Sequence, residues 1–88
     1  MNKQYKILIY TSNNCTFCNS AKELLINKKL KFDEINISQN NNLKEEMIKK
    51  TNGLMTVPQI FINSVHIGGF KELNKLNSSK KLDGIINK

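Results

Sequence analysis

The stretch KILIYTSNNCTFCNSAKELLINKK, residues 6–29, contains both cysteines of the chain, Cys15 and Cys18. The apolar run just before them, residues 5–11, is rich in Ile and Tyr and is typical of a short buried strand. Ser-Asn-Asn then provides turn residues, and the apolar spacing that follows predicts a helix to about Lys28. The sequence therefore places its two thiols at the junction between a buried strand and a helix.

The remainder of the chain continues to alternate between strand and helix patterns. We predict a strand at 31–37, a helix at 39–53, strands at Gln59–Ile62 and Val65–Ile67, and helices at 70–77 and 80–88. Asn63-Ser64 separates the two later strands and predicts a two-residue hairpin turn. A right-handed crossover joins the first two strands in parallel. The order β-α-β-α-β-β-α thus predicts an α/β fold with one four-stranded mixed sheet, flanked by helices on both faces.

Each predicted helix has one apolar side that can face the sheet. These sides are formed by Phe17, Ala21, Leu24 and Leu25, by Leu43, Met47 and Ile48, by Phe70, Leu73 and Leu76, and by Leu82, Ile85 and Ile86. The asparagine run before the second helix supplies its N-cap. In the last strand, Val65 and Ile67 are core candidates, so alternation points His66 to solvent. We interpret His66 as a surface residue rather than a catalytic base.

Size and charge limit the classes of function. A chain of 88 residues builds one core, so we predict a single domain over residues 1–88. The net charge is +7, and its lysines occur in every segment without the interleaved aromatic residues that stack nucleic-acid bases. The apolar start is too short for a secretory signal, and no stretch is long enough to span a bilayer. We expect a cytoplasmic monomer without nucleic-acid or membrane partners, whose basic surface favours small anionic substrates.

The position of the cysteines predicts redox chemistry. Cys15 falls in the first turn of a helix, where backbone N–H groups lack acceptors and the helix dipole is positive. Cysteines at such positions have pKa values of roughly 3.5–7.5, against about 8.5 for a free thiol. Cys18, three residues later, is expected to be more buried and to remain protonated. Cys15 would therefore attack a disulfide, and Cys18 would resolve the mixed disulfide.

Two other interpretations of the pair remain open from the residues alone. The cysteines could be half of a structural zinc site, although such a site needs four ligands and the chain has one histidine besides. They could also be inert core thiols, although the turn residues beside Cys15 favour exposure. A disulfide across so short a spacing removes little chain entropy, so it would be a poor structural brace.

Several motifs in order resemble the glutaredoxin family, in particular the small dithiol bacterial type. They are IYTSNNCTFC, EEMIKKTNG, TVPQIFI, HIGGF and LDGIIN, and together they cover nearly the whole chain. The resemblance implies a thioredoxin fold, with glutathione as reductant and substrate. It also implies a cis peptide bond at Pro58, which would face Cys15, and a Val57 backbone that pairs with the cysteine moiety of glutathione.

The same resemblance implies a set of glutathione-binding residues: Phe17, Thr56, Val57, Pro58, Gly69, Phe70, Lys71 and Lys49. In this set the backbone N–H groups of Phe70 and Lys71 hold the γ-glutamyl carboxylate, because a helix N-terminus is an anion site. Gly69 allows the backbone to come close to the ligand.

The chain departs from the family pattern at four positions. Thr16 replaces the usual proline after the first cysteine, and Phe17 replaces a tyrosine, which keeps an apolar wall but loses the hydroxyl. Ser12 replaces a lysine that typically helps to hold the glycine carboxylate, and Lys49 is our candidate substitute. Lys71 stands where the family often has an acidic residue, which alters recognition of the γ-glutamyl group.

Three functions follow from these interpretations. In the first, the chain is a glutathione-disulfide oxidoreductase that acts on disulfide-containing or glutathionylated proteins through Cys15 and Cys18. In the second, it carries a [2Fe-2S] cluster between two chains, each supplying Cys15 and glutathione, since Thr16 frees the loop that proline would restrict. In the third, it is an electron donor reduced by thioredoxin reductase, which the Gly-Gly and Thr-Val-Pro motifs disfavour.

Overall fold

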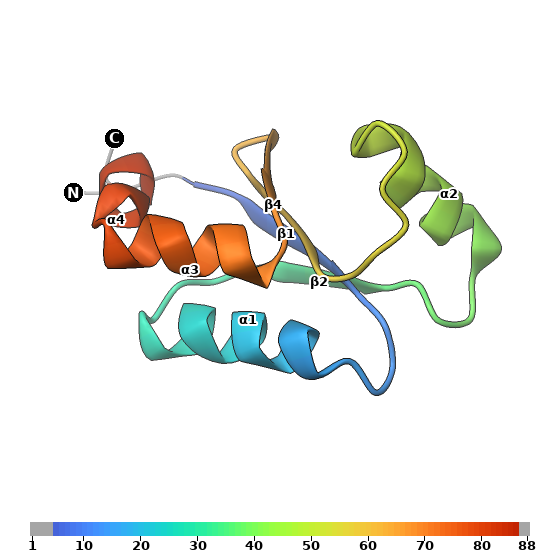
Figure 1. The fold of residues 1–88 in the computed structure, drawn as a ribbon, viewed down its shortest axis with the longest axis horizontal. Helices are drawn as coiled ribbons and strands as arrows, with labels where there is room; N and C mark the ends of the chain where they lie inside the picture. Colours follow the sequence, from blue (N-terminus) through green and yellow to red (C-terminus); the bar gives the residue numbers. More distant parts are fainter. Residues whose placement is uncertain (1–4, 87–88) are drawn as a thin grey trace.

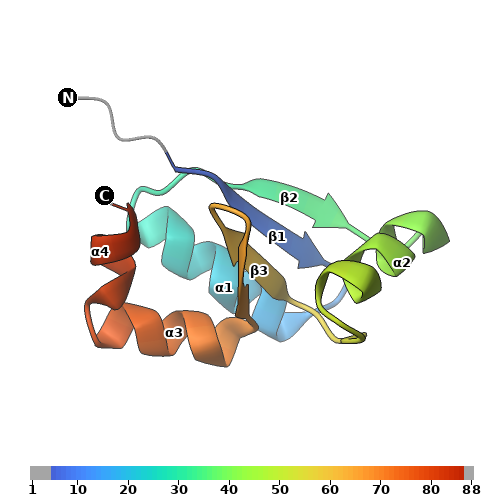
Figure 2. The same cartoon turned by 90° about the horizontal axis from the view of Figure 1, so that it is seen from above.

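The sheet has four strands, as predicted. A computed structural model describes residues 5–86, and its strands are β1 (Ile7–Thr11), β2 (Asp33–Asn36), β3 (Gln59–Ile62) and β4 (Val65–Gly68). Their order across the sheet is β2-β1-β3-β4; Figure 1 labels β1, β2 and β4, and Figure 2 labels β3 beside β1. β1 pairs in parallel with β2 and antiparallel with β3, and β3 pairs antiparallel with β4. The mixed sheet is therefore confirmed.

The helices form layers on both sides of this sheet. They are α1 (Thr16–Asn27), α2 (Asn41–Lys50), α3 (Phe70–Ser78) and α4 (Lys81–Ile86). α1 and α3 lie on one face and α2 lies beyond the other (Figure 2). The last helix was predicted to extend to residue 88, and residues 87–88 lie outside the part of the chain that the structure describes. None of the helices within residues 5–86 has the length and apolar character needed to cross a membrane.

Burial on both faces explains the nearly continuous apolar run of β1. Ile7 and Ile9 belong to the larger core cluster with α1, α3 and α4, whereas Tyr10 belongs to a second cluster with Met47 of α2. Alternate side chains of a strand point to opposite faces, so a strand covered on both faces needs apolar residues at successive positions. β1 is thus the central element that both layers share.

Local signals set the ends of the elements. The side-chain oxygen of Asn40 accepts a hydrogen bond from the Leu43 N–H at 3.1 Å, so the asparagine run does cap α2. Asn63 and Ser64 have φ values of 52° and 69°, which is the left-handed geometry of a two-residue hairpin turn. Asn63 also exchanges hydrogen bonds with the backbone of Lys6, which ties the turn to the start of β1.

The prediction for β4 was wrong at Val65, which is 62% exposed. Beside the hairpin turn Ile62 pairs with Val65 and Phe61 with His66, and the register shifts only beyond them, where Ile60 pairs with Gly68. Val65 therefore lies beside the turn on an edge strand and belongs to neither core cluster. His66, paired with Phe61, is half-buried against its ring at a centroid distance of 5.0 Å rather than pointing freely to solvent.

The buried side of α1 is rotated relative to the apolar side that we predicted. Its buried residues are Cys18, Ala21 and Leu25, at helical spacings of three and four. Phe17 precedes this stripe by about 100° around the helix and is 64% exposed. The predicted core position of Phe17 was wrong, and its ring is available to the surface next to Cys15.

Packing of α2 is tested by Met47→Ala. Met47 is fully buried and anchors α2 to the sheet, so the variant should lose about 2–5 kcal/mol of unfolding free energy. Met55→Ala removes the same side chain from a position that is 66% exposed and should change stability by less than about 0.5 kcal/mol. Urea denaturation followed by circular dichroism measures both. Equal losses in the two variants would contradict this packing.

Candidate active site

The cysteine pair lies where β1 turns into α1. Cys15 is the N-cap of α1, one residue before the predicted first turn, and its Sγ accepts a hydrogen bond from the Cys18 N–H at 3.1 Å. A disulfide joins Cys15 to Cys18 in this structure. Cys18 is 1% exposed whereas Cys15 is half-buried, as expected for an attacking and a resolving residue.

The surroundings of Cys15 favour negative charge on its sulfur once the disulfide is reduced. A backbone N–H that points at the sulfur stabilises the charged form of the group, and the positive end of the helix dipole adds to the effect. The first turn of α1 contains no acidic residue that would oppose it.

The turn before Cys15 is held by polar side chains whose role no sequence motif indicated. The Asn13 N–H donates to Ser38 Oγ at 2.6 Å, and Asn36 Nδ2 donates to Asn13 Oδ1 at 2.9 Å. Asn14 between this anchor and Cys15 has φ of 56°, a conformation that asparagine tolerates better than most residues. The turn therefore presents Cys15 in a fixed orientation.

A second polar group supports the same end of β1. The hydroxyl of buried Thr11 donates to Glu34 at 2.6 Å, and Lys22 of α1 lies 3.1 Å from the same carboxylate oxygen. The hydrogen bond from Thr11, followed by the contact with Lys22, lowers the pKa of Glu34. This group ties β1, β2 and α1 together below the cysteine turn.

The Val57–Pro58 segment faces the cysteines. Its peptide bond is cis, and the Val57 carbonyl oxygen lies 3.8 Å from Cys15 Sγ. Gln59, which is buried, donates from Nε2 to the carbonyl and hydroxyl oxygens of Thr56 at 3.0 and 3.2 Å. His66 Nε2 is 2.7 Å from Gln59 Oε1. His66 thus helps to brace this segment through Gln59.

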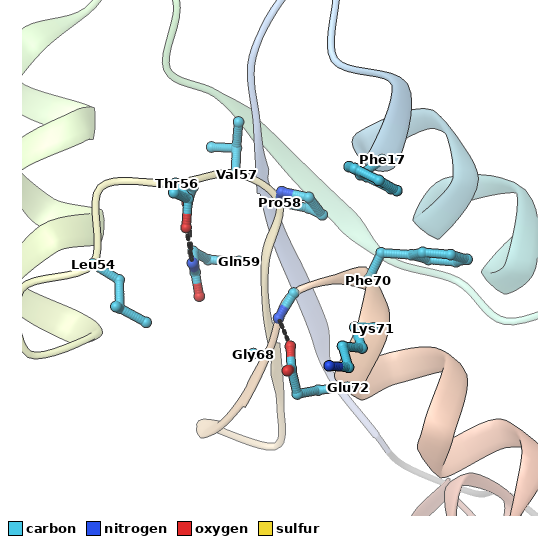
Figure 3. A pocket seen from close by; sticks show the side chains of 11 residues that line it. Phe17, Leu54, Thr56, Val57, Pro58, Gln59, Gly68, Phe70, Lys71 and Glu72 are labelled. Carbon is cyan, nitrogen blue, oxygen red and sulfur yellow. Dashed lines mark hydrogen bonds between the residues drawn. The ribbon is translucent and has the colours of Figure 1, made fainter.

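A cavity of about 390 Å³ opens beside this segment (Figure 3). It is lined by Phe17, Leu54, Thr56, Val57, Pro58, Gln59, Gly68, Gly69, Phe70, Lys71 and Glu72. Seven of the eight residues predicted to bind glutathione are therefore gathered around one hollow. The rings of Phe17 and Phe70 stack at a centroid distance of 6.2 Å and form one wall.

Lys49 is the predicted residue that the cavity does not include. It follows buried Met47 by two positions, which is about 200° around the helix, and it is exposed on α2. Four further residues line the cavity that were not predicted from the sequence: Leu54, Gln59, Gly68 and Glu72. The sequence could have indicated Glu72, because an acidic residue three positions after a helix N-cap commonly accepts a hydrogen bond from the N-cap backbone.

The far end of the cavity is the N-terminus of α3. Gly69 is the N-cap, and its N–H donates to Glu72 Oε1 at 2.8 Å. The first backbone bond of the helix runs from Leu73 to Gly69, so the N–H groups of Phe70 and Lys71 have no acceptor within the helix. With the Lys71 side chain also in the lining, this end of the cavity suits a carboxylate.

Within residues 5–86, no group of three or more His, Cys, Asp or Glu side chains is arranged to hold a metal ion. The zinc interpretation of the cysteine pair therefore finds no further ligands near it. The one histidine of the chain, His66, is engaged with Gln59.

The glycine before the α3 cap is tested by Gly68→Ala. Gly68 has φ of +124°, and a Cβ there would lie 2.8 Å from Glu72 Oε1. The substitution should cost more than about 1 kcal/mol of unfolding free energy. Gly84→Ala is the control, since a Cβ at Gly84 in α4 meets nothing within 4 Å and alanine favours a helix by about 0.5–1 kcal/mol. Thermal unfolding of both variants checks the pair, and stabilisation by Gly68→Ala would contradict the geometry.

Comparison with known proteins gives a consistent result. A sequence model of the glutaredoxin family, described as "Glutaredoxin", matches residues 7–67. Glutaredoxin 1 of Rickettsia prowazekii (strain Madrid E) is 42% identical over 89 aligned positions, covering 98% of this chain and 94% of that protein. Glutaredoxin 3 of Escherichia coli (strain K12) is 45% identical over 78 positions, covering 89% of this chain and 93% of that protein. The solution structure of a glutaredoxin from Brucella melitensis superposes with a TM-score of 0.84 at 38% identity, covering 98% of this chain and 92% of that one.

Proposed function

The chain belongs to the glutaredoxin family and is a thiol oxidoreductase, and on that premise we propose that it reduces disulfides with glutathione through Cys15 and Cys18. The observation that carries the proposal is the cavity. It runs from Val57, whose carbonyl oxygen is 3.8 Å from Cys15 Sγ, to the N-terminus of α3. A small peptide with a thiol near its middle and a carboxylate at one end matches that layout.

Each part of glutathione has a proposed contact. Its cysteine moiety pairs with the backbone of Val57 as a short strand, which brings its sulfur beside Cys15. Its γ-glutamyl carboxylate accepts hydrogen bonds from the N–H groups of Phe70 and Lys71. Phe17 supplies the apolar wall.

Lys71 changes the balance of charge at the γ-glutamyl end. The carboxylate of Glu72 is occupied by the Gly69 N–H, whereas Lys71 brings a cation to the same end of the cavity. We propose that Lys71 pairs with the γ-glutamyl carboxylate in addition to the backbone N–H groups. Lys49, exposed near the end of α2, is our proposal for the glycine carboxylate, which the Ser12 position leaves without a lysine.

With a glutathionylated protein, the reaction needs Cys15 alone. The Cys15 thiolate attacks the glutathione sulfur, a Cys15–glutathione disulfide forms, and the protein leaves as a thiolate that takes up a proton. A second glutathione, as its thiolate, then attacks the glutathione sulfur of this disulfide. Glutathione disulfide is released and the Cys15 thiolate is restored. In the net reaction one free glutathione is consumed, and the protein–glutathione disulfide is exchanged for a protein thiol and glutathione disulfide.

With a protein disulfide, both cysteines take part. Cys15 attacks one sulfur of the substrate, and the other sulfur leaves as a thiolate. Cys18, after losing its proton, attacks the Cys15 sulfur, which releases the reduced protein and forms the Cys15–Cys18 disulfide. This product is the state in which the structure holds the pair, and two glutathione molecules return it to the dithiol.

The competing functions are less well supported. The [2Fe-2S] alternative needs a free Cys15 thiolate from each of two chains, whereas Cys15 is bonded to Cys18 in this structure, so we do not propose a cluster. An assay with each electron donor distinguishes reduction by thioredoxin reductase from reduction by glutathione. We also propose that residues 1–88 form a single domain and that the protein is a monomer. A cytoplasmic location, which we propose as well, would supply reduced glutathione.

The division of labour between the cysteines is tested with two variants. Cys15→Ser should reduce turnover of every disulfide to the uncatalysed rate, because the accessible thiolate is lost and the remaining thiol, Cys18, is buried. Cys18→Ser should keep deglutathionylation and lose most reduction of protein disulfides, because the mixed disulfide is no longer resolved. The assay couples a glutathionylated substrate to glutathione and glutathione reductase, with thioredoxin reductase as the alternative donor. Deglutathionylation by the Cys15→Ser protein, or reduction by thioredoxin reductase alone, would refute the proposal.

Stabilisation of the Cys15 thiolate is tested by alkylation of the reduced protein across a pH range. The Cys18 N–H at 3.1 Å from the sulfur and the helix N-terminus should place its midpoint well below the value of about 8.5 for a free thiol. Ser12→Lys should lower the midpoint further, because it adds a cation three residues before Cys15. Ser64→Lys adds the same charge at the hairpin turn of the β3–β4 pair and serves as the control. A midpoint near that of a free thiol would contradict the argument.

A further inference from the structure

The one histidine of the chain is held in place on an edge strand. His66 lies in β4 opposite Phe61 of β3, and the two rings pack at a centroid distance of 5.0 Å. The imidazole is half-buried, and its Nε2 is 2.7 Å from Oε1 of buried Gln59. Packing against a neighbouring strand restricts the orientation of the ring. His66 is therefore a fixed support for the side chain of Gln59.

The other contacts of Gln59 decide which group donates in this hydrogen bond. Gln59 Nε2 lies 3.0 Å from the carbonyl oxygen of Thr56 and 3.2 Å from its hydroxyl oxygen (Figure 3). A carbonyl oxygen only accepts hydrogen bonds, so the NH2 group of Gln59 faces Thr56 and Oε1 faces His66. Because Oε1 also only accepts, the proton of the neutral imidazole has to be on Nε2. The hydrogen-bond network thus assigns the Nε2–H tautomer to His66.

The amide of Gln59 holds a loop that has few other hydrogen bonds. Within residues 5–86, no hydrogen bond from backbone to backbone involves residues 55–58. The two bonds that Gln59 donates to Thr56 therefore fix the chain directly before Val57. The carbonyl oxygen of Val57 is 3.8 Å from Cys15 Sγ, and its backbone is the proposed partner of the cysteine moiety of glutathione. The orientation of the Gln59 amide thus bears on the binding of glutathione.

Burial makes Gln59 depend on the donor that His66 provides. Gln59 is 3% exposed, so the polar atoms of its side chain need partners inside the protein. Without His66, Oε1 would be a buried acceptor with no partner, which is unfavourable. Gln59 lines the cavity, and turning its amide towards water there satisfies Oε1 but breaks the bonds to Thr56. His66 therefore keeps Gln59 on Thr56 and out of the space that glutathione needs.

We propose that His66 is a positioning residue for glutathione. By donating from Nε2–H to Gln59 Oε1 it fixes the Gln59 amide, and the amide in turn holds Thr56 so that the Val57 backbone faces the cysteine moiety of glutathione. His66 acts through Gln59 and takes no part in the making or breaking of bonds. This inference rests on the proposed glutathione-dependent function and adds a residue that determines how tightly glutathione is held.

Two variants separate the donor from the rest of the side chain. His66→Gln keeps an N–H donor at a similar distance from the backbone, whereas His66→Met has nearly the same length and no donor. The assay measures turnover of cysteine–glutathione disulfide with glutathione and glutathione reductase. His66→Met should raise KM about five- to tenfold and leave kcat nearly unchanged, because the lost hydrogen bond acts on substrate and transition state alike. His66→Gln should keep the KM of the unmodified protein.

The route through Gln59 is tested by Gln59→Met, alone and together with His66→Met. If His66 acts only through Gln59, the double variant should have the same KM as Gln59→Met alone. A second measurement is independent of activity. The ring nitrogen signals of His66 in the NMR spectrum of the unmodified protein should be those of the Nε2–H tautomer.

Ile7→Val is the control for lost stability, because Ile7 is buried at the start of β1 in the other core cluster. It should lower the free energy of unfolding without changing KM. The positioning role alone would be overturned by an unchanged KM in His66→Met, by an equal rise of KM in His66→Gln or Ile7→Val, by additive effects in the double variant, or by an Nδ1–H tautomer. Failure of the unmodified protein to turn over cysteine–glutathione disulfide would overturn the proposed function with it.

Discussion

The hydrogen bond from the Cys18 N–H to Cys15 Sγ is the contact on which the rest of the site depends. It makes a sulfur atom the cap of α1, so the group that reacts also ends the helix. A capping atom accepts hydrogen bonds best when it carries negative charge. The local folding of the chain and the reactivity of the thiol are therefore favoured by the same geometry.

The surrounding fold keeps that geometry in place from three directions. Asn13, bonded to Asn36 and Ser38, fixes the turn that leads into Cys15. Gln59, bonded to Thr56, fixes the loop that faces Cys15. Burial of the central strand by helices on both faces supplies the rigid base for both. Side chains of the sheet that look structural in the sequence thus position the catalytic sulfur.

The sequence was sufficient for the architecture because its signals were local. Apolar periodicity, the asparagine cap and the Asn-Ser turn each act over a few residues, and each was found where expected. Val65 was misplaced because alternation along the strand does not show that it stands beside the turn on an edge strand. Phe17 was misplaced because its exposure depends on the exact phase of α1. The polar braces from Asn13 were missed because they join residues more than twenty positions apart, and the contact of His66 with Gln59 was missed because it joins two strands across the sheet. Lys49 was chosen by its charge alone, and helix phase turns it away from the buried Met47.

The central claim is that one cavity joins the Cys15 sulfur to an anion site at the start of α3. The most direct measurement is a crystal structure of the Cys18→Ser variant trapped as its Cys15–glutathione disulfide. The account predicts the γ-glutamyl carboxylate within hydrogen-bond distance of the Phe70 and Lys71 N–H groups, with the glutathione backbone paired to Val57. A glutathione that lies outside the cavity, with its carboxylates away from α3, would contradict it.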